Sequence, residues 1–216
     1  MLAEPDKAIE RGQRFWNRFA PRYAARPIQD VAAYEALIAD ASSRLRATDR
    51  VLEIGCGTGG NAIRLAPAVA QLTATDFSAE MVKIAKSKPA PGNLCFVVSE
   101  ATTAIEGAPY DAICTFNVLH LVKDPPGLLK HIHAQLRPGG LFISKTWCFA
   151  DLGVPLRLLF SVLRRAGLFP PSLSLSVAQL QRSIVDAGFD IVELRILGSR
   201  VQNPYIVARK PAGQVV

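Results

Sequence analysis

The sequence lacks three features that would each point to a class of protein. No apolar run approaches the roughly 20 residues that a membrane-spanning helix needs, and the first seven residues carry two acids where a signal peptide has basic residues. The four cysteines show no Cys-x-x-Cys spacing, which argues against a disulfide framework and a zinc motif. We therefore expect a cytoplasmic protein whose thiols are reduced and buried.

Histidine is also scarce, with three in the chain. His131 and His133 stand two positions apart on a predicted helix, so they point to different faces and cannot form a zinc site together. We expect no metal.

What the chain does contain is a globular composition with excess positive charge. Half of the 216 residues are apolar and a fifth are charged, which favours one packed domain over disorder. The net charge of +7 would favour contact with nucleic acid or with an anionic membrane surface. Much of it lies in an amino-terminal series and in one later segment: Arg11, Arg14, Arg18, Arg22 and Arg26, then Arg157, Arg164 and Arg165.

Strand-like and helical patterns alternate through the middle of the chain. Two amphipathic helices are predicted first, over residues 5–20, ending before Pro21, and over residues 28–45. Alternation of strands and helices then implies a parallel sheet covered on both faces. The predicted strands are 50–54, 71–75, 94–98, 110–116 and 141–146, and the helices are 60–66, 79–86 and 125–136.

The carboxyl-terminal part predicts a helix from Ser176 to about residue 187 and an antiparallel pair of strands, 189–197 and 204–210. The expected fold is thus α/β: a Rossmann-like, doubly wound sheet of seven strands, mostly parallel, with a terminal antiparallel hairpin. We expect one domain over residues 1–216. Its parts are amino-terminal cap helices (1–48), a cofactor-binding core (49–146), a helical lid insertion (147–175) and the final helix and hairpin (176–216).

A glycine-rich loop follows the first predicted strand. Glycines let the backbone turn sharply and approach a ligand closely. Gly55, Gly57 and Gly60 satisfy the dinucleotide pattern G-x-G-x-x-G, and Asp76 lies near the distance expected for an acid that binds a ribose hydroxyl. This loop alone permits NAD.

Several motifs in order favour another cofactor. Glu53 followed by Gly55, Gly57 and Gly59 resembles the E/D-x-G-x-G-x-G motif of class I S-adenosylmethionine-dependent methyltransferases. Residues 75–81, 110–120 and 136–140 resemble that family's later motifs in the same order. Residues 15–23 are similar to the amino-terminal aromatic motif of its small-molecule branch, the menaquinone/ubiquinone C-methyltransferase-like (methyltransferase type 11) proteins.

The resemblance implies roles for individual residues toward S-adenosylmethionine. Gly55, Cys56, Gly57 and Gly59 would line its methionine part, with Glu53 near the ammonium group and Asp76 on the ribose hydroxyls. The remaining implied contacts are Phe77 and Met81 against adenine, Glu100 and Ala101 where the family often has an Asp-Ala pair, the backbone of Asn117, and Tyr23 closing over the cofactor.

Methyl transfer needs an acceptor held in line and at most one base, because the sulfonium already activates the methyl group. His120 is the candidate, since it follows the fourth strand at the ligand-binding edge of the sheet and its ordinary pKa suits a general base near neutrality. A histidine there can also be a structural hydrogen-bonding residue.

The insertion over residues 147–171 is rich in leucine and phenylalanine, which is unusual for an exposed connection. It suits a lid over an apolar pocket, an interfacial helix at an anionic membrane, or permanent packing on the body. We expect a small, lipophilic acceptor. The alternatives are an RNA methyltransferase, an NAD-dependent oxidoreductase and a non-catalytic binder. The fourth strand lacks the Asn/Asp-Pro-Pro-Tyr/Phe motif of amino-methylating nucleic-acid enzymes, which disfavours N-methylation of adenine or glutamine. No appended RNA-binding module is visible either, and we expect no nucleic-acid partner.

Overall fold

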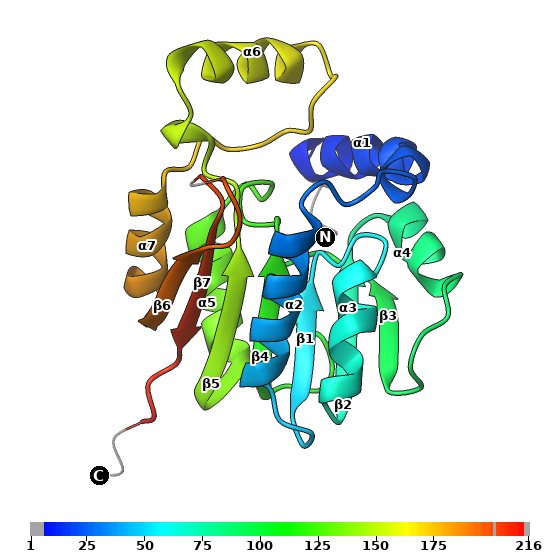
Figure 1. The fold of residues 1–216 in the computed structure, drawn as a ribbon, viewed down its shortest axis with the longest axis vertical. Helices are drawn as coiled ribbons and strands as arrows, with labels where there is room; N and C mark the ends of the chain where they lie inside the picture. Colours follow the sequence, from blue (N-terminus) through cyan, green and yellow to red (C-terminus); the bar gives the residue numbers. More distant parts are fainter. Residues whose placement is uncertain (1–6, 201, 214–216) are drawn as a thin grey trace, which may run out of the picture.

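A seven-stranded sheet forms the centre of the computed structural model, which describes residues 7–200 and 202–213 (Figure 1). Five strands are parallel, and the last strand of the chain pairs antiparallel with both of its neighbours. This confirms the predicted fold class. The spatial order is β3 (Leu94–Val98), β2 (Gln71–Asp76), β1 (Arg50–Ile54), β4 (Tyr110–Phe116), β5 (Leu136–Lys145), β7 (Pro204–Arg209) and β6 (Asp190–Ile196).

Helices cover both faces of this sheet, as a parallel sheet requires. Alternate residues of one strand serve the two cores, so that Val51 belongs to one apolar cluster and Leu52 to the other. The first cluster includes side chains from α2 (Val31–Arg44), α3 (Gly60–Leu65) and α4 (Ala79–Lys86), and the second from α5 (Pro125–Gln135) and α7 (Val177–Asp186).

Two further helices lie at the carboxyl edge of the parallel strands. Figure 1 shows α1 (Lys7–Ala24) near this edge and α6 (Val154–Arg165) further out. No residue of α6 is buried. The described part of the chain has no helix that is both long and apolar enough to cross a membrane.

The structure corrects the end of the first predicted helix and the start of the second. The first helix continues through Pro21 to Ala24, and the amide of Ala25 still donates to the carbonyl of Pro21. Its predicted start at residue 5 lies outside the described residues. The second helix begins at Val31 instead of residue 28, because the Asp30 side chain accepts from the Ala33 amide and caps it.

The fifth strand is longer than predicted, because it begins at Leu136, directly after α5. Leu136 pairs with Tyr110, and the ladder resumes after an irregularity at Ala112 opposite Leu141. The predicted turn at residues 137–140 is therefore a bulged part of this strand. Cys95 is a second correction: it is exposed, whereas the other three free cysteines are buried.

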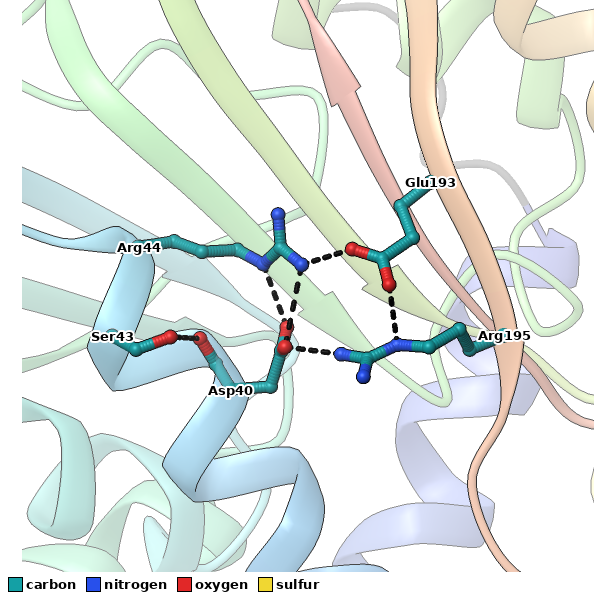
Figure 2. A network of polar contacts seen from close by, with 5 residues as sticks. All are labelled: Asp40, Ser43, Arg44, Glu193 and Arg195. Carbon is teal, nitrogen blue, oxygen red and sulfur yellow. Dashed lines mark hydrogen bonds and ion pairs between the residues drawn. The ribbon is translucent and has the colours of Figure 1, made fainter.

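A network of four charged side chains ties α2 to β6 at the antiparallel end of the sheet (Figure 2). Arg44 Nε lies 2.7 Å from Asp40 Oδ2, and Arg195 Nε lies 2.6 Å from Glu193 Oε1. Arg44 also contacts Glu193, and Arg195 contacts Asp40. Partial burial by itself would raise the pKa of Asp40, but hydrogen bonds from Arg44, the Tyr205 hydroxyl and Arg195 outweigh it and lower the pKa to about 2.

We predict that Asp40→Asn lowers the free energy of unfolding at pH 7 by about 1.5–3 kcal/mol, the usual range for hydrogen bonds to charged groups. The unfolded carboxyl titrates near 3.9 and the folded one near 2, so this stabilisation is complete above about pH 4 and is lost as the pH falls toward 2. Urea unfolding at pH 7 and pH 3 measures it, with Asp186→Asn on an exposed face as control. If the unfolding free energy lost in Asp40→Asn were as large at pH 3 as at pH 7, the lowered pKa of Asp40 would be contradicted.

Candidate functional site

The loop after β1 is held against the end of β2 by its backbone. The amides of Gly55 and Cys56 both donate to the carbonyl of Thr75, at 2.7 and 2.8 Å. Gly55 has a φ of 73°, and a Cβ on it would lie 2.3 Å from Cγ2 of Val118. The ends of β1 and β4 can approach this closely only if residue 55 is glycine.

The end of the same loop packs on an aromatic ring. Gly59 has a φ of 79°, precedes α3 as its N-cap, and would place a Cβ 2.7 Å from Cζ of Phe96. Between these glycines the Cys56 thiol is buried, which raises its pKa well above the ordinary value. The thiol therefore stays protonated at neutral pH.

The Asp76 carboxylate bridges two loops at the carboxyl edge. Its Oδ2 accepts from the Gly57 amide and its Oδ1 from the Ser78 amide, each at 2.9 Å. Burial raises the pKa of Asp76, and the two backbone hydrogen bonds oppose that rise. A carboxylate has about four acceptor sites, so these bonds leave capacity for a further ligand.

Glu53 is the most unusual side chain of the site, because it is fully buried and neither carboxyl oxygen has a hydrogen-bond partner among the described residues. Burial raises the pKa of Glu53 to about 8, which the nearby Asn61 amide offsets only in part. A buried polar group without a partner is costly. The arrangement therefore favours a ligand that brings a positive charge or a hydrogen-bond donor.

Helix α1 closes the site through polar contacts that the sequence did not indicate. The Ser78 hydroxyl donates to Oδ1 of Asn17 at 2.7 Å, and Nε2 of Gln13 donates to the carbonyl of Phe77 at 2.7 Å. Tyr23 of the same helix lies beside the glycine loop, where a Cβ on Gly57 would be 3.8 Å from its Cε1. In the sequence, only the four-residue spacing of Gln13 and Asn17, which puts both on the same side of a helix, could have indicated that they contact one segment.

The other predicted contact residues range from exposed to almost fully buried. Asn117 is exposed after β4 with a φ of 61°, and its amide donates to the carbonyl of Lys145 at 2.6 Å. Ala101 is half-buried, while Glu100 directs an exposed side chain to solvent. Phe77 is half-buried with its ring against α1, and Met81 is almost fully buried, so it offers little surface to a ligand in this conformation.

His120 is buried next to the aromatic part of the insertion. Its ring lies 5.4 Å from that of Phe149, and its Nδ1 has no hydrogen-bond partner among the described residues. Burial lowers the pKa of His120 to about 4, so the assumption of an ordinary histidine pKa is wrong. The ring is neutral at physiological pH.

Beyond Phe149 the insertion forms a cavity of about 380 Å³ that is open on one side, and no residue of the glycine loop lines it. Its volume falls in the range of small-molecule pockets. The 3-10 helix η2 (Phe149–Asp151), α6 and the segment returning to α7 contribute its walls. The lining residues are Phe149, Val154, Arg157, Leu158, Phe160, Ser161, Arg164 and Ser174.

Residues 16–194 match the model of a family described as a methyltransferase domain. Over 215 residues the chain is 27% identical to the mitochondrial arginine-hydroxylase NDUFAF5 of Danio rerio, covering 92% of this chain and 63% of that protein. It is 30% identical over 148 residues to the ubiquinone biosynthesis O-methyltransferase of Xanthomonas axonopodis pv. citri, covering 66% of this chain and 60% of that protein. The chain thus spans less than two thirds of the length of both curated relatives.

Among solved structures, the chain is similar to magnesium protoporphyrin IX methyltransferase from Synechocystis PCC 6803 with bound SAH. The TM-score is 0.72 at 19% sequence identity, covering 94% of this chain and all of that chain (100%). At this identity the likeness establishes the fold alone.

We predict that Gly55→Ala destabilises the protein more than Gly139→Ala. Both glycines have left-handed φ values, 73° and 77°, but a Cβ at Gly139 meets nothing within 4 Å. The difference isolates the clash with Val118, and overpacking of this kind costs about 1–3 kcal/mol. Urea unfolding of the two variants measures it, and equal losses would show that the close approach does not constrain residue 55.

Proposed function

Because the chain belongs to the class I S-adenosylmethionine-dependent methyltransferases, we propose that it transfers the cofactor's methyl group to a small, lipophilic acceptor. The observation that carries the proposal is the pair of carboxyl groups at the carboxyl edge of the sheet. Glu53 lacks a partner there, and Asp76 has acceptor capacity left.

The residues present fit the cofactor. The carboxyl of Glu53 would pair with the ammonium group of the cofactor. This group would be the positively charged partner that the buried carboxyl does not have within the protein. The glycines at 55, 57 and 59 would leave room for the methionine part, with the protonated thiol of Cys56 beside them. When bound, S-adenosylmethionine supplies an activated methyl group on a sulfonium.

Asp76 would hold the ribose, because an ionised carboxylate accepts hydrogen bonds from two hydroxyls at once. Its orientation is already fixed by the amides of Gly57 and Ser78. Tyr23 would close over the cofactor from α1, and the Asn117 backbone would face its amino end. The adenine ring would contact Phe77, Met81, Glu100 and Ala101. Because Met81 is almost fully buried, the residues around it would have to move to expose it to the ring.

His120 would act on the acceptor. Its neutral ring would accept a hydrogen bond from the O–H or N–H group that receives the methyl, and so orient that group. A base with a pKa of about 4 does not retain a proton near neutrality, so the proton would pass on to solvent. The contact between His120 and Phe149 supports an acceptor position between the cofactor loop and the insertion.

We predict that Asp76→Ala and His120→Ala separate cofactor binding from turnover. The first variant should lose most of the rise in melting temperature that S-adenosylhomocysteine gives the wild type. The second should keep that rise but transfer methyl groups on the order of 100-fold more slowly.

Turnover is followed with methyl-labelled S-adenosylmethionine and the polar, lipid and RNA fractions of a lysate, in which we expect label in the lipid fraction. An unchanged thermal shift in Asp76→Ala would refute the ribose role. Equal loss of cofactor binding in His120→Ala would make His120 a structural residue.

We also propose that the protein is cytoplasmic and contacts anionic membranes peripherally. The side of α6 away from the cavity exposes Leu159 and Val162, of which Val162 is 63% accessible. Helix α1 exposes arginines at positions 11, 14, 18 and 22, and Figure 1 shows both helices at the same end of the molecule. An apolar surface beside basic residues suits a lipid interface.

We predict that the protein sediments with vesicles of anionic lipid at low salt and is released by salt, because each Lys or Arg near such a surface contributes about 1 kcal/mol. Val162→Glu should weaken sedimentation, whereas Val185→Glu, at an exposed position on α7, should not. Equal sedimentation with neutral and anionic vesicles, or none, would contradict the proposal.

A further inference from the structure

The cavity formed by the insertion has both aromatic and positively charged lining residues. Phe149 and Phe160 give it an aromatic wall, with ring centroids 5.3 Å apart, and Phe169 packs against both. Arg157, Ser161 and Arg164 line it from α6. The side of α6 that borders the cavity therefore combines two arginines and a serine with the apolar side chains of Val154, Leu158 and Phe160.

The two arginines differ in how they are held. Arg164 donates through Nη1 to the carbonyl of Ser172 at 2.8 Å and through Nη2 to Oγ of Ser161 at 3.2 Å, which fixes its guanidinium. Arg157 is exposed, and its side chain has no hydrogen bond or ion pair among the described residues. Its donors are free to bind a ligand.

No acidic residue balances this charge at the cavity. None of the lining residues is Asp or Glu. Within residues 147–175 the one acid is Asp151, and its Oδ2 accepts from the Val177 amide at 2.7 Å. The Ser161 hydroxyl already donates to the Arg157 carbonyl at 2.9 Å. The two guanidinium groups and the Ser174 hydroxyl therefore present donors and positive charge to the cavity.

From this arrangement we propose that the cavity binds an acceptor that carries an oxyanion, a carboxylate or a phosphate, on an apolar body. The oxyanion would bind Arg157 and Arg164, and the apolar body would lie on Phe149 and Phe160. Phe149 also contacts His120, which links this cavity to the edge where the methyl group is transferred. The inference rests on the proposed function and restricts its acceptor to amphipathic acids.

The test uses three probes of similar shape, 2-naphthoate, 2-naphthyl phosphate and the neutral 2-naphthamide. Their binding to the full chain saturated with S-adenosylhomocysteine is measured by calorimetry. At least one anion should bind about tenfold more tightly than the amide, the gain expected from a hydrogen bond to a charged group. The tighter of the two anions identifies the oxyanion.

Arg157→Gln should remove this preference and leave the affinity for the amide unchanged, and Arg157→Lys should restore part of it. Arg165→Gln is the matched control, because it removes an exposed arginine of the same helix that does not line the cavity. The amide binding as tightly as both anions, or Arg165→Gln acting like Arg157→Gln, would overturn the inference. S-adenosylhomocysteine binding in the same samples shows whether the proposed function has failed instead.

Discussion

The position of the Asp76 carboxylate is the constraint on which the rest of the site depends. It accepts the Gly57 amide from the glycine loop and the Ser78 amide from the start of α4, so it fixes the ends of β1 and β2 relative to each other. Ser78 in turn caps α4 and donates to Asn17 of α1. One carboxylate thus sets the loop, the adjoining helix and the helix that covers them.

Glu53, at the same carboxyl edge of the sheet, is a side chain that destabilises the folded protein. Its folded pKa of about 8 lies above the ordinary value, so Glu53 disfavours the folded state increasingly as the pH rises from about 4.3 to 8. Neither carboxyl oxygen has a hydrogen bond of normal geometry among the described residues, and the nearby Asn61 side chain offsets only part of the effect of burial. A cationic ligand accounts for it, because perturbed groups of this kind cluster at functional sites.

Local sequence patterns predicted the elements that depend on local contacts. The bounds of β1, β3 and β4 agree with the sequence, as does the glycine loop, because short apolar runs followed by glycines specify them directly. The start of β5 depends on pairing between Leu136 and Tyr110, 26 positions apart by their numbers, which no local pattern contains. The same holds for the contact between Asn17 and Ser78, which are 61 positions apart. The arginines of the cavity lie within one insertion that the sequence does single out, but which of them face the cavity depends on how that segment folds back on itself.

The account is tested most directly by the protons exchanged when S-adenosylhomocysteine binds. Titration calorimetry at pH 7 in two buffers of different ionisation enthalpy counts them. With a folded pKa of about 8, the Glu53 carboxyl is mostly protonated in the free protein and must ionise to pair with the ammonium group. The account predicts release of about one proton by the wild type and none by Glu53→Gln. Binding without proton release, or equal release by the variant, would contradict it.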